Sequence, residues 1–321
     1  MNSLHIILQL TISTILSAGI TKLSIPFLKK YFNYEPDNRS SHIQSKPTAG
    51  GISFVLTGCI FSLINGNISP LLCLPLAIVG FLDDFIRLSR SSRFLVQFLT
   101  VFFLFYNSSY FSDLVEKIDF YKVIIIFLAI VFFLGVINFI NFMDGLDGLV
   151  AGSMVIIIFT ASILISNTYY ALLGGLLGFL IFNWHPSKVF MGDGGSTFLG
   201  AVFIGIIISS DDWLIALKIV LVATPLLADA FICIVRRFLS KQSIFEAHRS
   251  HLYQRLNQAG FSHGYVSTIY IIFTLILSLS VLLFNIKITF LFIVIEFFVA
   301  ILLDQKMSVP FLSSISSKKS L

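Results

Sequence analysis

Long apolar runs recur along almost the whole chain, and they decide its fold class. A helix needs ~20 mostly apolar residues to cross a hydrocarbon core of ~30 Å, so each sufficiently long run counts as a candidate membrane span. The composition agrees, since 57% of the 321 residues are hydrophobic, 12% are charged and the mean hydropathy is +0.95. We therefore expect an all-α polytopic membrane protein with about 11 transmembrane helices, or about 10 if short neighbouring runs merge. The predicted spans are 3–28, 48–66, 69–85, 92–108, 121–139, 148–166, 168–184, 195–209, 213–235, 264–284 and 287–304.

We expect a single transmembrane domain over 1–304 and a Ser/Lys-rich cytoplasmic tail over 305–321. The first run has no Lys or Arg before it and is too long for a typical signal-peptide core, which favours an uncleaved first span. The cysteines Cys59, Cys73 and Cys233 fall inside apolar spans without metal-ligand spacing. This pattern predicts packing residues, and neither a disulfide framework nor a zinc site.

The basic residues predict which side of the membrane each loop faces. Nearly all loop Lys and Arg residues fall on one side, in loops 29–47, 86–91, 140–147, 185–194, 236–263 and the tail. Because cytoplasmic loops carry an excess of Lys and Arg, we expect the N-terminus outside and the C-terminus inside, in the cell (inner) membrane. The net charge of +5 is then mainly a topology signal with some attraction to anionic lipids, and we expect no nucleic-acid partner.

The first two inside loops carry polar groups suited to phosphates. Gly50 and Gly51 open the second span, where glycine lets backbone N–H groups approach an anion closely; close helix packing is the alternative. Asp83 and Asp84 end the third span, where adjacent carboxylates are costly unless they meet a cation or a proton donor. A solvated helix end capped by nearby arginines is the alternative for this pair.

A third polar group lies between residues 138 and 148. Asn138 and Asn141 are neighbours on one helical face, whereas the steps Asp144-Gly145 and Asp147-Gly148 indicate that the helix unwinds there. Four oxygen-bearing side chains in ten residues suit a hard cation such as Mg²⁺, or a nucleoside.

A fourth group surrounds Asp193, which stands between glycines just before the eighth span. Such an Asp can hold Mg²⁺ while backbone amides face phosphate oxygens, or it can simply cap the helix. The fifth group, in loop 236–263, contains His248, Arg249, His251 and Arg255. These donors suit a diphosphate and a sugar, although the spacing also fits an amphipathic helix on lipid head groups.

Two acidic residues fall inside predicted spans, away from their ends. Asp229 lies two helical turns before Arg236 on the same face, which predicts an ion pair, and Glu296 lies in the middle of the last span. A transporter of sugar nucleotides or lipid-linked sugars would have such groups at mid-membrane as its main feature, together with inverted repeats. It is the alternative to an enzyme; a non-catalytic scaffold would not need acidic clusters on one side.

The order of the motifs GFLDD, NFINFMDGLDGL, VFMGDGGSTFLG and AHRSHLYQRL resembles the polyprenyl-phosphate N-acetylhexosamine-1-phosphate transferases of glycosyltransferase family 4. This family includes initiators of O-antigen and enterobacterial common antigen synthesis and the peptidoglycan enzyme phospho-MurNAc-pentapeptide translocase. The resemblance runs from about Arg39 to about Arg255. It implies that a polyprenyl phosphate, such as undecaprenyl phosphate, attacks the β-phosphorus of a UDP-N-acetylhexosamine and releases UMP, as the first membrane step of a cell-surface polysaccharide.

The resemblance also implies residue roles. Asp193 and Asn141 look like ligands of Mg²⁺, with Mn²⁺ as the alternative ion. Asp83, with Asp84 beside it, looks like the group that deprotonates or orients the lipid phosphate. The remaining implied site residues are Asp144 near the metal and nucleotide, Asn138 and Asp147 at the nucleotide, His248, Arg249, His251 and Arg255 at the diphosphate and sugar, and Arg39 and Lys46 at the phosphates.

Two departures narrow the implied substrate. Related sequences often read Pro-Arg-Gly-Gly-Gly where this chain has Pro47-Thr48-Ala49-Gly50-Gly51, so an Arg is missing that Lys46 is a candidate to replace. The last loop lacks the triple-His run of the peptidoglycan enzyme, which argues against a UDP-MurNAc-pentapeptide substrate. Its sequence instead resembles the O-antigen and capsule initiators, whose sugars include GlcNAc and 6-deoxy-HexNAc such as FucNAc or QuiNAc. The sequence does not decide whether the protein is a monomer or a homodimer.

Overall fold

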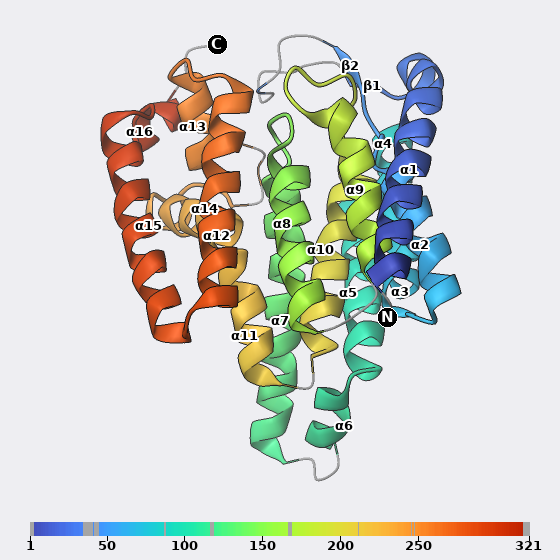
Figure 1. Ribbon diagram of the computed structural model, residues 1–321. Coiled ribbons are helices and arrows are strands. Elements are labelled where there is room, and N and C mark those ends of the chain that lie inside the picture. The colour runs from blue at the N-terminus through green and yellow to red at the C-terminus, as the bar shows by residue number, and fades with distance from the viewer. Residues whose placement is uncertain are drawn as a thin grey trace.

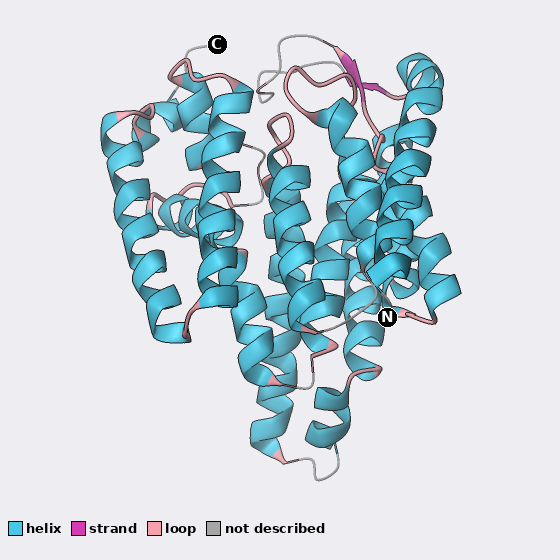
Figure 2. Ribbon diagram, in the orientation of Figure 1, coloured by secondary structure: helices cyan, strands magenta, loops and turns pink. Residues whose placement is uncertain are grey.

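The computed structural model describes residues 3–34, 41, 45–86, 88–115, 119–165, 169–210, 212–244, 246 and 248–316. Within these ranges the protein is a bundle of helices with one two-stranded antiparallel sheet at one end (Figures 1 and 2). The first half comprises α1 (Ser3–Tyr31), β1 (Asn33–Tyr34), β2 (Lys46–Pro47), α2 (Ile52–Asn65), α3 (Ser69–Leu72), α4 (Leu74–Ile86), α5 (Arg90–Tyr106), α6 (Ser109–Val115), α7 (Phe120–Phe142) and α8 (Leu149–Leu164). The second half comprises α9 (Tyr170–Asn183), α10 (Gly192–Ile208), α11 (Trp213–Val222), α12 (Thr224–Leu239), α13 (Leu252–Gln258), α14 (His263–Leu283), α15 (Ile286–Lys306) and α16 (Phe311–Ser316).

The helices confirm an all-α multi-pass membrane protein. Among the described residues, five helices are long and apolar enough to cross a membrane, or up to seven if each of two bent pairs counts as one span. Four shorter apolar helices, α2, α8, α9 and α10, fall on further predicted spans. The count of about 11 spans and the orientation of the termini stay predictions.

Helix α10 forms the centre of the bundle, and every residue from Gly194 to Ile208 is buried. It packs against α4 and α7, and small residues permit this closeness, as at other helix contacts in membranes. A Cβ atom at Gly80 of α4 would lie 2.5 Å from the Cα of Gly194, and one at Gly200 would lie 2.8 Å from the Cα of Ile137 on α7. The backbones therefore touch directly at these crossings.

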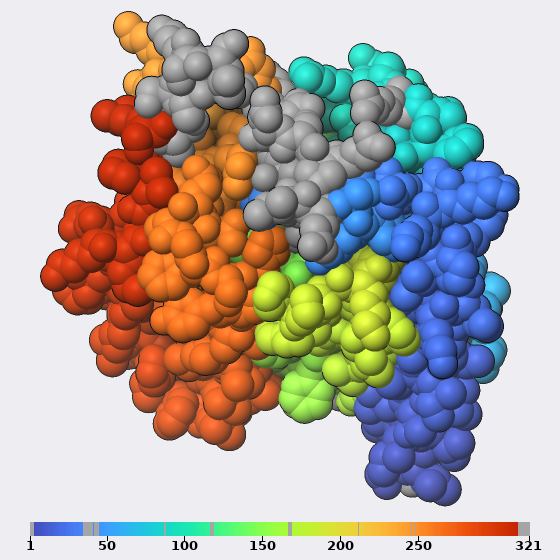
Figure 3. All heavy atoms as spheres, turned by 90° about the horizontal axis from the view of Figure 1, so that it is seen from above, coloured from blue at the N-terminus to red at the C-terminus, as the bar shows by residue number. Residues whose placement is uncertain are grey.

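The loops that precede α8 and α10, the β1–β2 sheet and α16 lie at one end of the bundle (Figure 1). Seen from that end, α14 to α16 lie on one side and α1 and α2 on the other, with α9 between them (Figure 3). The loops predicted to share the cytoplasmic side thus meet at one end of the molecule.

The predicted span 213–235 is divided between two helices. Helices α11 and α12 are bent by 72° relative to each other, and Pro225 stands in the first turn of α12. Proline has no N–H and starts a helix more easily than it continues one. A second bent pair, α5 and α6, turns by 80° just beyond the predicted span 92–108.

The predicted ion pair between Asp229 and Arg236 does not form. Its carboxylate accepts the backbone N–H groups of Leu252 and Tyr253 at 2.8 and 3.1 Å and the Tyr270 hydroxyl at 2.6 Å. Arg236 instead donates to Asp304 of α15 at 2.8 Å. Both residues lie in α12, two helical turns apart, and each has a nearer partner in another segment: the N-terminus of α13 for Asp229 and α15 for Arg236.

The contact between α4 and α10 yields a stability prediction. Gly80→Ala places a methyl group against the Gly194 backbone, which cannot move aside as a flexible side chain can. We expect a loss of about 1–3 kcal/mol, the usual cost of overpacking, seen as a lower midpoint of thermal unfolding in detergent. Gly135→Ala on α7 is the matched control, because a Cβ there meets nothing within 4 Å. Equal midpoints for the two variants would contradict the packing argument.

Candidate active site

The ends of three helices bring oxygen-bearing side chains together. Asp83 lies in the last turn of α4, Asn141 in the last turn of α7 and Asp193 in the first turn of α10. One guanidinium nitrogen of Arg93, Nη1, donates to Asp83 at 2.5 Å and to Asp193 at 3.2 Å. The Ser196 hydroxyl of α10 donates to the Asn141 amide oxygen at 2.8 Å. The three residues expected to share a site therefore converge at one end of the bundle.

Asp84 follows Asp83 on α4, and with Asp83 and Asp193 it forms what we call the acidic group. Its Oδ1 accepts the backbone N–H of Asp193 at 3.4 Å, whereas its buried Oδ2 accepts no hydrogen bond. A Cβ at Gly192 would collide with that Oδ2, and Gly192 has φ +79°, a conformation that favours glycine. A buried carboxylate oxygen without a donor is costly, and a cation would relieve that cost.

Two cavities adjoin at Asp193, which lines both. The larger has a volume of about 1140 Å³ and combines apolar walls from α5, α7 and α12 with Asn138, Asn141, His248 and His251. The smaller, of about 270 Å³, is lined by Asp84, Asp144 and backbone-rich segments around residues 145 and 191. The acidic group thus borders both a larger, mainly apolar cavity and a smaller, more polar one.

Asp144 lies in the turn after α7 and faces the smaller cavity. Burial, followed by the nearby carboxylates of Asp193 and Asp147, raises the pKa of Asp144 to about 7. The turn follows the predicted unwinding of the helix, since α7 ends at Phe142. A carboxyl group with this pKa can hold or release a proton near neutral pH.

Asp147 lies behind the cavity wall rather than on it, and its side chain is only 1% exposed. It accepts the Ser187 hydroxyl at 2.6 Å, the Ser187 N–H at 3.1 Å and His185 Nδ1 at 2.9 Å, and Lys46 Nζ lies 3.7 Å away. Burial alone would raise the pKa of Asp147, but hydrogen bonds from His263, Ser187 and His185 hold it well below its usual range. Asp147 therefore joins the loop before α8 to the loop before α10.

The candidate site residues of loop 236–263, the fifth polar group, lie in two different places. His248 and His251 line the larger cavity, and their rings stack with centroids 5.0 Å apart. Burial alone would lower the pKa of His251, but the neighbouring Asp229 and Cys233 raise it to about 9. Arg249 lies between them on the segment that leads into α13, where its backbone carbonyl accepts a hydrogen bond from the side chain of Gln258 at 2.7 Å.

Arg255 does not reach the acidic group, although a diphosphate or sugar contact was predicted for it. It is 2% exposed, and it donates to the Ser250 carbonyl, the Ser308 hydroxyl and the Val309 carbonyl at 2.9–3.1 Å and to Asp304. The structure therefore uses Arg255 to fasten α13 to the end of α15. Arg39 lies outside the described residues.

The paired glycines serve helix packing. The N–H groups of Gly50 and Gly51 donate to the carbonyls of Phe190 and Met191 at 2.9 and 3.0 Å. A Cβ at Gly51 would lie 2.7 Å from the Cα of Gly195. These amides are thus already occupied, and the packing interpretation holds over the anion-binding one.

Sequence reasoning missed Arg93 as a site residue because its charge was counted only toward membrane orientation. The signal available in the sequence was that Arg93 stands ten residues after Asp83, across a short turn. Sequence reasoning also missed Gln97, whose Oε1 accepts a hydrogen bond from Nδ2 of Asn138 at 3.0 Å on the wall of the larger cavity. Asn138 is therefore held on the wall beside Asn141.

Comparison with known proteins agrees with the geometry. Residues 68–211 match the family model described as Glycosyl transferase family 4. The chain is 31% identical over 260 residues to the probable undecaprenyl-phosphate N-acetylglucosaminyl 1-phosphate transferase of Bacillus subtilis, covering 71% of this chain and 70% of that protein. The chain belongs to glycosyl transferase family 4. The resemblance read from the motifs is thereby confirmed.

Other members of glycosyl transferase family 4 match at similar levels. The phospho-N-acetylmuramoyl-pentapeptide-transferase of Thermotoga maritima is 31% identical over 278 residues, which is 79% of this chain and 89% of that protein. The enzyme of the same name from Listeria innocua is 34% identical over 236 residues, covering 61% of this chain and 72% of that protein. The range matched by the family model contains the whole acidic group, whereas loop 236–263 lies beyond it.

The contacts of Asp147 yield a prediction. In Asp147→Asn an amide N–H₂ group faces donors of Ser187 and His185, so buried donors lose their acceptor, at about 1–3 kcal/mol. The midpoint of thermal unfolding should fall, and by more than in Ser187→Ala, which removes one donor only. Because the pKa of Asp147 is lowered, its contribution is complete above about pH 4, the ordinary Asp value, and shrinks as the pH falls further. An unchanged midpoint at neutral pH would contradict the structural role.

Proposed function

We propose that the protein is a membrane enzyme that transfers N-acetylhexosamine-1-phosphate from a UDP-sugar to undecaprenyl (polyprenyl) phosphate and releases UMP. The product would be the first lipid-linked intermediate of a cell-surface polysaccharide. The observation that carries the proposal is the position of Asp193, which is bridged to Asp83 by Arg93 and faces both cavities. Two substrates that enter from different sides would meet there.

The two cavities suit the two substrates. The larger cavity has an apolar wall that includes Phe94, Phe98 and Phe139, which suits a polyprenyl chain whose phosphate reaches the acidic group. The smaller cavity is bounded by Tyr34 and Phe190 and by the turn around Gly145, which suits a nucleotide. Lys46 lies over the Phe190 ring at 5.5 Å and would add positive charge on the diphosphate side.

The donor set fits a divalent metal ion. Asp193, Asn141 and the unpartnered oxygen of Asp84 offer hard oxygen ligands of the kind that Mg²⁺ prefers, with Mn²⁺ as the alternative. When bound, such an ion offsets the negative charge that builds up on the diphosphate oxygens. Among the described residues, Arg93 is the cation that pairs with Asp83 and Asp193, so the negative charges of the acidic group outnumber the positive one. The metal ion would offset the remaining negative charge.

The protein groups orient the reactants. Asp83 is fixed by the Leu88 N–H at 2.6 Å and by Arg93, and it orients the lipid phosphate or takes its remaining proton. An oxygen of the lipid phosphate forms a bond to the β-phosphorus, the bond from that phosphorus to the bridging oxygen breaks, and UMP leaves with that oxygen. Asp144, with its raised pKa, is the neighbouring group able to exchange a proton near neutral pH.

The sugar side is assigned to the loop before α13. His248 and His251 line the larger cavity next to Asn138 and would contact the sugar and diphosphate, with Arg249 beside them. Asp147 and Arg255 act as positioning residues, since their side chains are engaged with other protein groups. The absence of a triple-His run from the sequence favours GlcNAc or a 6-deoxy-HexNAc over UDP-MurNAc-pentapeptide.

The proposed orientation places the acidic group at the cytoplasmic face. The acids lie at helix ends, on the side of the bundle that holds most basic loop residues. A transporter would concentrate such groups at mid-membrane. Glu296 is the exception, and it lies apart from the acidic group in a cavity between α12, α14 and α15.

The reaction is tested by UMP release from purified protein with polyprenyl phosphate, a panel of UDP-HexNAc donors and Mg²⁺, with the lipid product identified by mass spectrometry. Asp83→Asn and Asp193→Asn should each lower kcat/KM by roughly 100-fold or more, as expected when one preorganised electrostatic contact is lost. Asp113→Asn on α6, at the opposite end of the bundle, is the matched control and should retain activity (Figure 1). Full activity of both site variants would overturn the assigned roles.

Arg93 supplies an independent prediction. Arg93→Gln removes charge-assisted hydrogen bonds worth about 1.5–3 kcal/mol each, so kcat/KM should fall about 10- to 100-fold. Arg90→Gln removes the same charge one helical turn earlier, on the wall of the same cavity, and should have a smaller effect. A larger loss for Arg90→Gln than for Arg93→Gln would show that the general positive charge matters more than the bridge.

A further inference from the structure

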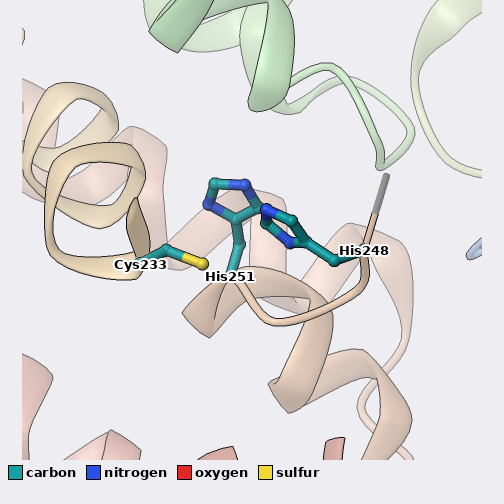
Figure 4. Close-up of side chains that lie close together, drawn as sticks. All are labelled: Cys233, His248 and His251. Atoms are coloured by element: carbon teal, nitrogen blue, oxygen red, sulfur yellow. The ribbon is translucent and has the colours of Figure 1, made fainter. Parts of the chain in front are cut away.

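The bend before α12 brings a cysteine into contact range of two histidines. Potential ligand atoms of Cys233, His248 and His251 all lie within 4.8 Å of one another. Figure 4 shows the thiol pointing from α12 toward the two rings, which lie side by side on the segment leading into α13. Cys233 stands 15 residues before His248 in the chain, so no sequence spacing rule indicates this cluster.

The surroundings are those of a metal site. Cys233 and His251 are each 3% exposed. The buried Nδ1 of His251 has no hydrogen-bond partner, and Asp229 Oδ1 lies 3.8 Å from it, beyond hydrogen-bonding distance. A carboxylate that faces a ligating histidine is a common outer partner of protein-bound metals. Because His248 and His251 also line the larger cavity, an ion has a route to the cluster.

Closing the site requires only small movements. Ligand atoms around a tetrahedral Zn²⁺ at about 2.0–2.3 Å lie about 3.5 Å apart, so a side-chain rotation of about 1 Å is sufficient. Nδ1 of His248 accepts a long 3.4 Å hydrogen bond from the Ser250 N–H. Metal binding through either ring nitrogen of His248 ends that bond, which is a small loss beside a metal–ligand bond.

We propose that Cys233, His248 and His251 form a binding site for a thiolate-seeking divalent cation such as Zn²⁺, with a fourth position open to the larger cavity. A sulfur and two imidazoles select a softer ion than the all-oxygen group around Asp193 does. The site is therefore distinct from the proposed Mg²⁺ site. Bound Zn²⁺ draws both histidines away from a sugar-diphosphate and inhibits the enzyme; this consequence rests on the proposed function, whereas binding itself does not.

Binding is tested with Co²⁺ as the probe, added to the purified full-length protein. We expect the near-ultraviolet absorption that marks a thiolate bound to cobalt, its loss on addition of Zn²⁺ and its persistence in excess Mg²⁺. Cys233→Ser should abolish the absorption, and Cys233→Ala provides a second variant if the serine protein unfolds. Cys59→Ser, which changes another buried thiol, is the matched control and should retain it. No absorption in the wild type, or an unchanged one in both Cys233 variants, would overturn the proposal.

Inhibition separates this inference from the proposed function. Zn²⁺ should suppress UMP release by wild type and Cys59→Ser, while Cys233→Ser should need about 10- to 100-fold more Zn²⁺, or more, for the same effect. Without Zn²⁺ the Cys233→Ser protein should keep its basal activity, since Cys233 is not part of the reaction site. A cobalt signal that depends on Cys233 in a protein that releases no UMP would refute the function and leave the metal site standing. Activity with no cobalt signal would do the reverse.

Discussion

The site depends on the crossing of α4 and α10, where two glycine backbones touch. Gly80 lies one turn before Asp83 and Asp84, and Gly194 directly follows Asp193. A larger residue at the crossing would separate these carboxylates by about the width of a methyl group or more. Gathering them is electrostatically unfavourable, and helix packing supplies the free energy that holds them together. The bridge from Arg93 reduces the repulsion, and the proposed cation would reduce it further.

The sequence was sufficient for the helical fold and the convergence of the acids because both follow from local patterns. Apolar runs mark helices, and Asp83, Asn141 and Asp193 each stand where a run ends on the basic side of the membrane. Their meeting then requires only that alternate loops share a side. Arg255 shows the limit of this reasoning, because its partner Asp304 is 49 residues away and a buried arginine looks the same in sequence as a substrate contact.

The bend at Pro225 could not be predicted from the sequence, although the proline itself is visible there. Whether a proline begins a new helix or kinks an old one depends on what receives the released chain. Here Asp229 accepts the first N–H groups of α13, so a carboxylate within α12 organises the loop that follows it. Cys233 lies one turn after Asp229 on the same face of α12, which is why a thiol with no motif spacing meets His251 and His248.

Two carboxylates in the chain illustrate how position decides the task of an acid. The carboxylate of Asp147 accepts hydrogen bonds from Ser187 and His185, and these bonds join two loops. Asp144, three residues earlier, faces an open cavity and other carboxylates, and its pKa is raised to about 7. The two neighbouring Asp-Gly steps thus supply one carboxylate that stabilises the cavity wall and one that faces the cavity. The proposed function uses both, because a nucleotide site needs a rigid wall as well as a group that can act on the phosphates.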